Sequence, residues 1–196
     1  MWETQKAELR KDIRSRLKAM PEEEKRILDR EIAERVLGLP EIAETKAVYG
    51  YASLNWEAGT GEVLEELRAQ KYIICLPKVT GETMEFFVTE SEQDLSEGSF
   101  HIMEPKNGCR KADETRSEIL RTAPILVPGM GFVETGARLG KGGGFYDRYL
   151  EQHAGHMTIA LAYEFQILGE IPVGPYDKNV DLIVTEKRVI RCKDRD

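Results

Sequence analysis

Short apolar runs that alternate with amphipathic helical patterns are the feature that most limits what this chain can fold into. Six such runs, rich in β-branched and aromatic residues, are strand candidates: residues 47–51, 73–77, 84–88, 125–127, 158–162 and 182–185. Strands that alternate with helices imply a mostly parallel sheet covered on both faces. We therefore predict an α/β fold, a Rossmann-like three-layer sandwich with a mainly parallel central sheet.

Two helices are expected before the first strand. Apolar side chains recur at helical spacing over residues 4–20. A second helix begins after Pro21, which suits the start of a helix, and ends before Gly38. After the first strand, Thr60 is a candidate N-cap for a further helix.

Length and charge exclude several classes of protein. A chain of 196 residues can bury one full core but is short for two, so we expect residues 1–196 to form a single domain. The apolar runs are too short to cross a bilayer, and the first residues lack an apolar signal core, which favours a cytoplasmic location and no membrane partner. A net charge of −7 disfavours nucleic acid as a partner, because phosphate backbones need an excess of Lys and Arg.

Cysteine and histidine give little sign of a metal centre. Cys75, Cys109 and Cys192 are odd in number and far apart, which is typical of reduced cytosolic thiols. His153 and His156 could place two imidazoles on one helical face, but no third ligand follows. Solvated side chains at a helix end are the simpler interpretation.

Residues 90–117 show no helical or strand period. A long irregular stretch inside a compact domain is usually functional or mobile. We expect it to be a lid that orders over a bound ligand.

A glycine-rich loop lies between the strand at 125–127 and a helix that begins at Phe145. It contains seven glycines: Gly129, Gly131, Gly136, Gly140, Gly142, Gly143 and Gly144. Such a loop exposes backbone N–H groups and a helix N-terminus to an anion, and Arg138 and Lys141 add positive charge. A nucleotide phosphate site is favoured over a merely flexible loop. Neither the Walker A pattern nor GxGxxG is present.

Two cations near the N-terminus border the buried face of the first helix. On a helical wheel at about 100° per residue, Lys6 and Arg10 lie beside the apolar stripe, whereas Lys11, Arg14 and Lys18 fall toward solvent. A buried cation needs an anionic partner. Phosphate and a structural salt bridge both remain possible partners.

The segment RLGKGGGFYDRYL resembles the signature of 5-formyltetrahydrofolate cyclo-ligases, also called methenyltetrahydrofolate synthetases. Further matches follow the family's order between Lys6 and Glu186: Lys-x-x-x-Arg (Lys6, Arg10), SLNWEAGT with Glu57, CLPKV, MEP, VPGMGF and VDLIVTE. Val133 stands where the family usually has Asp, and Phe145 where it often has Tyr.

The resemblance implies ATP-dependent closure of 5-formyltetrahydrofolate to 5,10-methenyltetrahydrofolate, with release of ADP and phosphate. The formyl oxygen would be phosphorylated first, and a neighbouring folate nitrogen would then displace the phosphate. ATP and Mg²⁺ are the expected co-substrate and ion, and the folate, polyglutamylated or not, is the expected substrate. Two alternatives stay open, a relative with another substrate and a non-catalytic folate- or nucleotide-binding module. We expect a monomer or weak homodimer.

The resemblance also assigns site residues. Arg10, Lys141 and Tyr146 are the expected catalytic residues. The residues expected to bind ATP are Lys6, Arg10, Arg138, Leu139, Gly140, Lys141, Gly142, Gly143, Gly144, Phe145 and Tyr146. The residues expected to bind the folate are Glu57, Lys141, Gly142, Gly143, Gly144 and Phe145. The carboxylates of Asp147 and Asp181 are assigned to magnesium, which prefers oxygen ligands. Lys78 and Lys106 are candidates for attracting the folate's glutamate tail.

Overall fold

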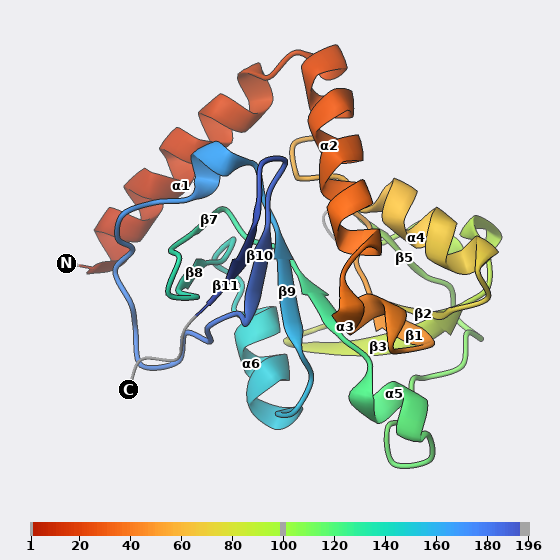
Figure 1. Cartoon of the computed structure of the whole chain (residues 1–196). Coiled ribbons are helices and arrows are strands. Elements are labelled where there is room, and N and C mark those ends of the chain that lie inside the picture. Colours follow the sequence, from red (N-terminus) through yellow and green to blue (C-terminus); the bar gives the residue numbers. More distant parts are fainter. Residues whose placement is uncertain (1, 99–100, 193–196) are drawn as a thin grey trace.

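A seven-stranded sheet runs through the centre of the molecule (Figure 1). The computed structural model describes residues 2–98 and 101–192. In spatial order the strands are β11 (Val189–Arg191), β10 (Leu182–Val184), β9 (Thr158–Leu161), β6 (Ile125–Val127), β1 (Ala47–Tyr49), β2 (Ile73–Thr80) and β3 (Thr83–Thr89). The five inner strands are parallel, and β3 and β11 join them antiparallel at the two edges. The predicted mainly parallel sheet is confirmed.

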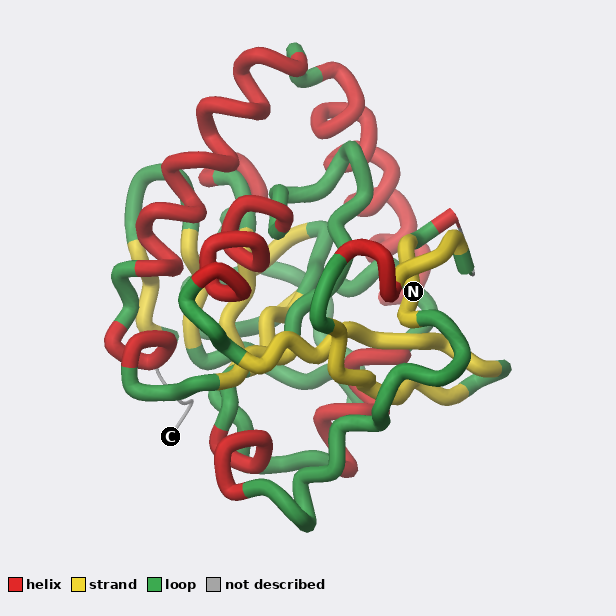
Figure 2. Tube along the Cα trace, turned by 90° about the vertical axis from the view of Figure 1, so that its right-hand side faces the viewer, coloured by secondary structure: helices red, strands yellow, loops and turns green. Residues whose placement is uncertain are grey.

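Helices cover both faces of this sheet, as the side view shows (Figure 2). One face carries α1 (Trp2–Ala19), α2 (Glu22–Leu37), α3 (Pro40–Ala43) and α4 (Gly61–Ala69), and the other carries α5 (Glu118–Thr122) and α6 (Phe145–Gln152). Side chains alternate accordingly along β1, where Val48 packs with the first group while Ala47 and Tyr49 pack with the second. The three-layer prediction and the two leading helices are confirmed, and the structure adds a third, four-residue helix, α3, before β1.

The order of the parallel strands locates a crevice. From β1 the chain moves outward to β2, then returns to place β6, β9 and β10 on the other side of β1. Sheets of this kind bind ligands outside the carboxyl ends of the strands where the order reverses, here between β1 and β6. The segment after β1 contains Glu57, and the segment after β6 is the glycine-rich loop. The Glu57 segment and the glycine-rich loop therefore lie at the same edge of the sheet, at the carboxyl ends of two neighbouring strands.

The prediction that residues 90–117 are irregular is wrong in part. They include a short 3₁₀ helix, η1 (Glu92–Asp94), and an antiparallel pair formed by β4 (Leu95–Glu97) and β5 (Met103–Pro105). Strands of three residues are too short to display a period, which explains why the pattern missed them. Phe100, an apolar residue of the expected lid, lies outside the described residues. A second unpredicted pair, β7 (Gly131–Phe132) and β8 (Arg138–Leu139), lies within the glycine-rich loop.

His153, which caps α6, and His156, in the loop that follows, are not merely solvated side chains as we expected. Nδ1 of His153 lies 3.1 Å from Glu114 Oε2, and Nε2 of His156 lies 3.3 Å from Glu114 Oε1. The hydroxyl of Tyr149 donates to the same carboxylate at 3.0 Å. Burial opposes ionisation of Glu114, but these partners hold its pKa below the ordinary value. The cluster anchors the end of the 90–117 segment to α6.

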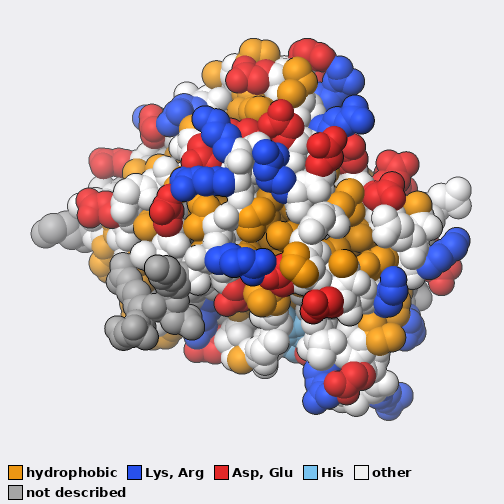
Figure 3. Space-filling view, in the orientation of Figure 1, with side chains coloured by type: hydrophobic (Ala, Val, Ile, Leu, Met, Phe, Trp, Pro, Cys, Tyr) orange, Lys and Arg blue, Asp and Glu red, His pale blue; other side chains and the backbone are white. Residues whose placement is uncertain are grey.

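Acidic and basic side chains are intermingled over the face seen in Figure 3. Within residues 2–98 and 101–192, no helix is both long and apolar enough to cross a bilayer.

Candidate active site

The glycine-rich loop joins the end of β6 to the start of α6. Gly142 and Gly144 have φ angles of 107° and 66°, in the left-handed region that glycine adopts without strain. No side chain in the described part of the chain caps α6, which starts directly after Gly144. The N–H groups of its first turn are therefore available to an anion, which the helix dipole also attracts.

Arg10 is held against this loop. Its Nε donates a hydrogen bond of 2.7 Å to the carbonyl oxygen of Gly140, and a Cβ placed on Gly142 would lie 3.7 Å from the guanidinium carbon. That distance is an ordinary van der Waals contact, so the guanidinium lies directly against Gly142, whose positive φ is what favours glycine there. The remaining guanidinium donors of Arg10 can serve an anion bound there.

Lys6 has a different partner. Its ammonium group forms an ion pair with Asp177, and the lysine side chain is 5% exposed. Of the two partners that the sequence left open, a structural salt bridge is the one found in this structure.

Arg138 and Asp147 form a clamp between the loop and α6. Nη2 of Arg138 lies 2.6 Å from Asp147 Oδ1, and Nη1 donates to the carbonyl oxygen of Pro128 at 3.1 Å. The backbone N–H of Lys178 donates to the same Asp147 oxygen at 3.1 Å. Oδ2 of Asp147 has no hydrogen-bond partner among the described residues, so one carboxylate oxygen remains for another ligand.

Asp181 does not join Asp147. It stands immediately before β10, at the opposite end of the parallel strands from the glycine-rich loop. Its Oδ2 accepts hydrogen bonds from the backbone N–H of Thr158 at 2.7 Å and from the Thr158 hydroxyl at 2.6 Å. The two carboxylates expected to share magnesium thus lie in separate hydrogen-bond networks, and no group of three or more possible metal-ligating side chains occurs in the described ranges.

The carboxylate of Glu57 is buried and forms an ion pair with Lys141. The Glu57 side chain is 5% exposed, and its Oε2 accepts a hydrogen bond of 2.8 Å from the backbone N–H of Leu54. Its other oxygen pairs with the Lys141 ammonium group, which also lies 5.5 Å from the centre of the Trp56 ring. The buried carboxylate is neutralised by a residue of the glycine-rich loop, so the segments after β1 and β6 meet directly.

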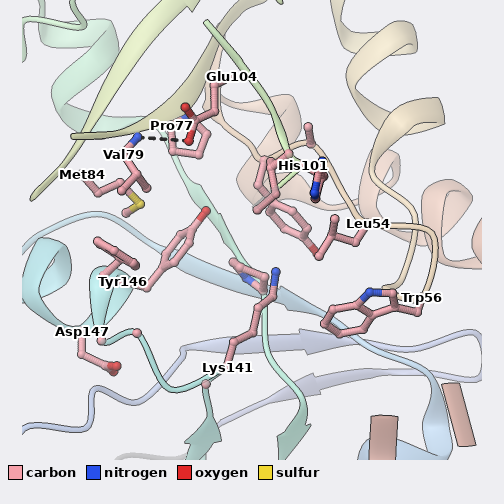
Figure 4. Close-up of a pocket in the computed structure, with 18 of the residues that line it drawn as sticks. Leu54, Trp56, Pro77, Val79, Met84, His101, Glu104, Lys141, Tyr146 and Asp147 are labelled. Atoms are coloured by element: carbon pink, nitrogen blue, oxygen red, sulfur yellow. Dashed lines mark hydrogen bonds between the residues drawn. The ribbon is translucent and has the colours of Figure 1, made fainter. Parts of the chain in front are cut away.

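A cavity of about 610 Å³ opens beside this ion pair (Figure 4). Apolar side chains form much of its wall: Leu54, Trp56, Pro77, Val79, Met84 and Ile102. Tyr146 points into it, and the buried hydroxyl of Tyr146 has no hydrogen-bond partner among the described side chains and backbone groups. Burial, and then the nearby Glu57 carboxylate, raise the pKa of Tyr146, so its hydroxyl stays protonated and can donate.

Most residues that the sequence assigned to ATP and folate line this cavity. They are Arg138, Gly140, Lys141, Gly143, Gly144, Phe145 and Tyr146, and Asp147, which the sequence assigned to magnesium, lines the cavity as well. The side chain of Leu139 instead lies in the hydrophobic core, and its carbonyl oxygen accepts from the Met130 N–H. Lys78 and Lys106 bond to backbone carbonyls of Pro105 and Gln93, and neither lines the cavity.

Sequence reasoning missed other cavity residues. Arg14 and Lys18 line it although the helical wheel assigned them only to solvent, and Trp56 forms part of its wall. The buried carboxylate of Glu104, from the MEP match, also faces the cavity and accepts a 3.3 Å hydrogen bond from the N–H of Val79. The spacing of Arg10, Arg14 and Lys18, each four residues apart, was the available signal for a continuous basic face.

Comparison with known proteins gives a consistent result. The sequence profile of the 5-formyltetrahydrofolate cyclo-ligase family matches residues 3–186. The 5-formyltetrahydrofolate cyclo-ligase of Mus musculus is 28% identical over 191 residues, covering 91% of this chain and 92% of the mouse protein. The enzyme of that name from Escherichia coli K12 is 29% identical over 182 residues, covering 90% and 98%.

Solved structures agree. The NMR structure of 5,10-methenyltetrahydrofolate synthetase from Aquifex aeolicus superposes with a TM-score of 0.83 at 32% identity, covering 97% of this chain and 94% of that one. A 5,10-methenyltetrahydrofolate synthetase from Mycoplasma pneumoniae gives a TM-score of 0.72 at 26% identity, with coverages of 92% and 98%.

Proposed function

Because the chain belongs to the 5-formyltetrahydrofolate cyclo-ligase family, whose members close 5-formyltetrahydrofolate to 5,10-methenyltetrahydrofolate with ATP, we propose that it does so through a phosphorylated formyl group in the cavity beside Tyr146 and Lys141. The observation that carries the proposal is the convergence of an apolar cavity, an uncapped helix N-terminus and the Lys141–Glu57 pair at one point. A flat heterocycle and a polyphosphate need those two environments side by side.

The proposed reaction has two steps. The formyl oxygen attacks the γ-phosphorus of ATP, a new P–O bond forms, and the bond to the β-phosphate oxygen breaks to release ADP. The neighbouring folate nitrogen then attacks the activated carbon and loses its proton, while the C–O bond breaks and phosphate leaves. Phosphoryl transfer of this kind depends on positioning and charge neutralisation.

The residues supply those requirements. The N–H groups of Gly143, Gly144 and the first turn of α6 hold the phosphates, with the Arg10 guanidinium on the other side of the loop. Lys141 moves from Glu57 to the transferring phosphoryl group and neutralises its charge. Tyr146 donates its hydroxyl proton in a hydrogen bond to the formyl oxygen or the phosphate. Glu57 accepts hydrogen bonds from the amino and amide groups of the folate ring.

Magnesium fits Asp147 better than Asp181. Oδ2 of Asp147 accepts no hydrogen bond within the described structure, and Asp147 lines the cavity from the first turn of α6, beside the proposed phosphate site. Asp181 is instead hydrogen-bonded to Thr158. We propose that Asp147 and phosphate oxygens hold the ion. When bound, the ion would offset the negative charge of the phosphates. Asp181 would then support the strand ends rather than the ion.

Residues 90–117 are proposed to act as a lid. His101 and Ile102 line the cavity next to Leu54, and β4–β5 carries Glu104 into its wall. Closure of this segment would keep water from the phosphorylated intermediate.

A single assay tests the proposed activity. Formation of methenyltetrahydrofolate is followed by absorbance with purified protein, ATP, magnesium and 5-formyltetrahydrofolate, and with each component omitted in turn. Product should form only in the complete mixture, in a one-to-one ratio with ADP. Tight folate binding without ADP release would instead identify a binding module, and ATP hydrolysis with another acceptor would identify a relative with a different substrate.

A further inference from the structure

Five cations line a groove along α1, next to the main cavity. They are Arg10, Lys11, Arg14, Lys18 and Lys141, and we call them the basic strip. The groove has a volume of about 470 Å³, and the other residues lining it are Ala7 and Ser15. The absence of any Asp or Glu from this lining is notable in a protein of net charge −7. Such a local excess of positive charge favours an anionic ligand.

Three members of the basic strip, Lys11, Arg14 and Lys18, have no role in the proposed reaction, and of these Arg14 and Lys18 also line the main cavity. Arg10 is bound to the glycine-rich loop and Lys141 to Glu57. Arg14 and Lys18 form no salt bridge or side-chain hydrogen bond with any residue in the described ranges. The guanidinium of Arg14 is instead positioned over the ring of Trp56, with 5.3 Å between the guanidinium carbon and the ring centre.

Arg14 and Lys18 border both the groove and the main cavity. Leu54, Trp56 and Ile102 line that cavity with them. At about 1.5 Å per residue, Arg14 is about 6 Å and Lys18 about 12 Å farther along α1 than Arg10. The strip therefore continues away from the phosphate loop, past the aromatic ring of Trp56.

We propose that Arg14 and Lys18 form a subsite for the carboxylates of the substrate's glutamate tail, including further γ-linked glutamates. The inference rests on the proposed function, because it assumes that the folate ring occupies the cavity beside Tyr146. The tail then passes Trp56 and reaches the guanidinium of Arg14, which can bind a carboxylate through two parallel hydrogen bonds. Lys78 and Lys106, the sequence candidates for this role, are engaged with Pro105 and Gln93.

The test compares substrates with one and with several γ-linked glutamates. In the wild type, the longer tail should lower KM about 10-fold. In the Arg14→Ala/Lys18→Ala double variant, that ratio should fall to about one, while kcat and the KM for ATP stay within about twofold. Arg16→Ala is the matched control, because Arg16 lies on the same helix, stacks on Phe165 and lines neither cavity. An unchanged ratio in the double variant, or no tail effect in the wild type, would overturn the proposal.

A nucleotide role is a distinguishable outcome. If Arg14 and Lys18 bound ATP, the double variant would raise the KM for ATP and leave the tail-length ratio intact, which rejects the tail subsite.

Failure of the proposed reaction would also be distinguishable. Trp2 and Trp56 are the two tryptophans of the chain, so Trp56 alone reports in a Trp2→Phe background. Titration with p-aminobenzoyl-tri-γ-glutamate should quench its fluorescence, and the double variant should need at least about 10-fold more ligand. No quenching in the Trp2→Phe protein would overturn the subsite whether or not turnover is found.

Discussion

The ammonium group of Lys141 lies against the buried carboxylate of Glu57. One residue is proposed to bind phosphate and the other the folate ring, and in the free protein each neutralises the other. A phosphate that draws Lys141 away would leave Glu57 buried without a partner, which is costly until a ligand donates to it. The two substrates should therefore assist each other's binding.

This assistance can be measured as a coupling between affinities. A non-hydrolysable ATP analogue should tighten 5-formyltetrahydrofolate binding by about 5- to 150-fold, as is typical of coupled sites. In Glu57→Gln the amide needs no cation, so the ratio of folate affinities with and without the analogue should fall toward one even though folate binds more weakly. Calorimetric titration of wild type and variant gives both ratios. Equal ratios in the two proteins would show that the ion pair does not couple the sites.

Asp147→Asn should affect stability as well as magnesium use. Asp147 neutralises Arg138, whose side chain is 3% exposed, so the carboxylate has a structural role besides any metal. Loss of a partner from a buried ion pair costs about 3 kcal/mol, so the variant should unfold at lower denaturant. The activity that remains should require much more magnesium.

Asp181→Asn serves as the comparison for Asp147→Asn. It also loses charge from a hydrogen-bonded aspartate, but at the other end of the strands. Its magnesium requirement should match that of the wild type. A shift equal to that of Asp147→Asn would restore Asp181 as a ligand.

Particular residues show how far the sequence could lead. The strand at Ile125–Val127, the helix from Phe145 and the loop between them followed from glycine placement and apolar runs, and the structure has all three. Whether a carboxylate is free or already bound depends on residues distant in sequence, as Lys6 with Asp177 and Asp181 with Thr158 illustrate. A helical wheel likewise separates buried from exposed positions but does not say which exposed side chains of α1 border a cavity.

Substitutions of Arg10 and Lys6 should have different effects, the first on ATP binding and the second on stability. Arg10→Ala removes a guanidinium that faces the glycine-rich loop, so it should raise the KM for ATP at least about 10-fold and the KM for folate far less. Lys6→Met leaves Asp177 without its ion-pair partner and should mainly lower the free energy of unfolding, by about 1 kcal/mol or more. Steady-state kinetics and denaturant unfolding of both variants check this. A specific rise in the KM for ATP with Lys6→Met at unchanged stability would return Lys6 to the phosphate site.

The lid proposal predicts a ligand-dependent change in amide exchange. Backbone amides at residues 101–104 should exchange more slowly when 5-formyltetrahydrofolate and a non-hydrolysable ATP analogue are both present than with the analogue alone, because His101 and Ile102 border the cavity that the folate would fill. Amides of β1, which is fully buried, provide the internal reference. Full protection of residues 101–104 in the free protein would identify a static wall.

Tyr146→Phe should separate stability from activity. The Tyr146 hydroxyl is buried and has no hydrogen-bond partner within the described structure. Because a buried unsatisfied polar group costs about 1 kcal/mol or more, removing this hydroxyl should raise the free energy of unfolding by about 1 kcal/mol. If the hydroxyl donates to the reacting oxygen, the same change should lower kcat about 10- to 100-fold. Burial raises the pKa of Tyr146 above its ordinary value of 10.0, so the hydroxyl stays protonated below that pH. The ratio of wild-type to variant kcat should therefore stay constant up to about pH 10. A more stable variant with wild-type kcat would leave the hydroxyl without a catalytic role.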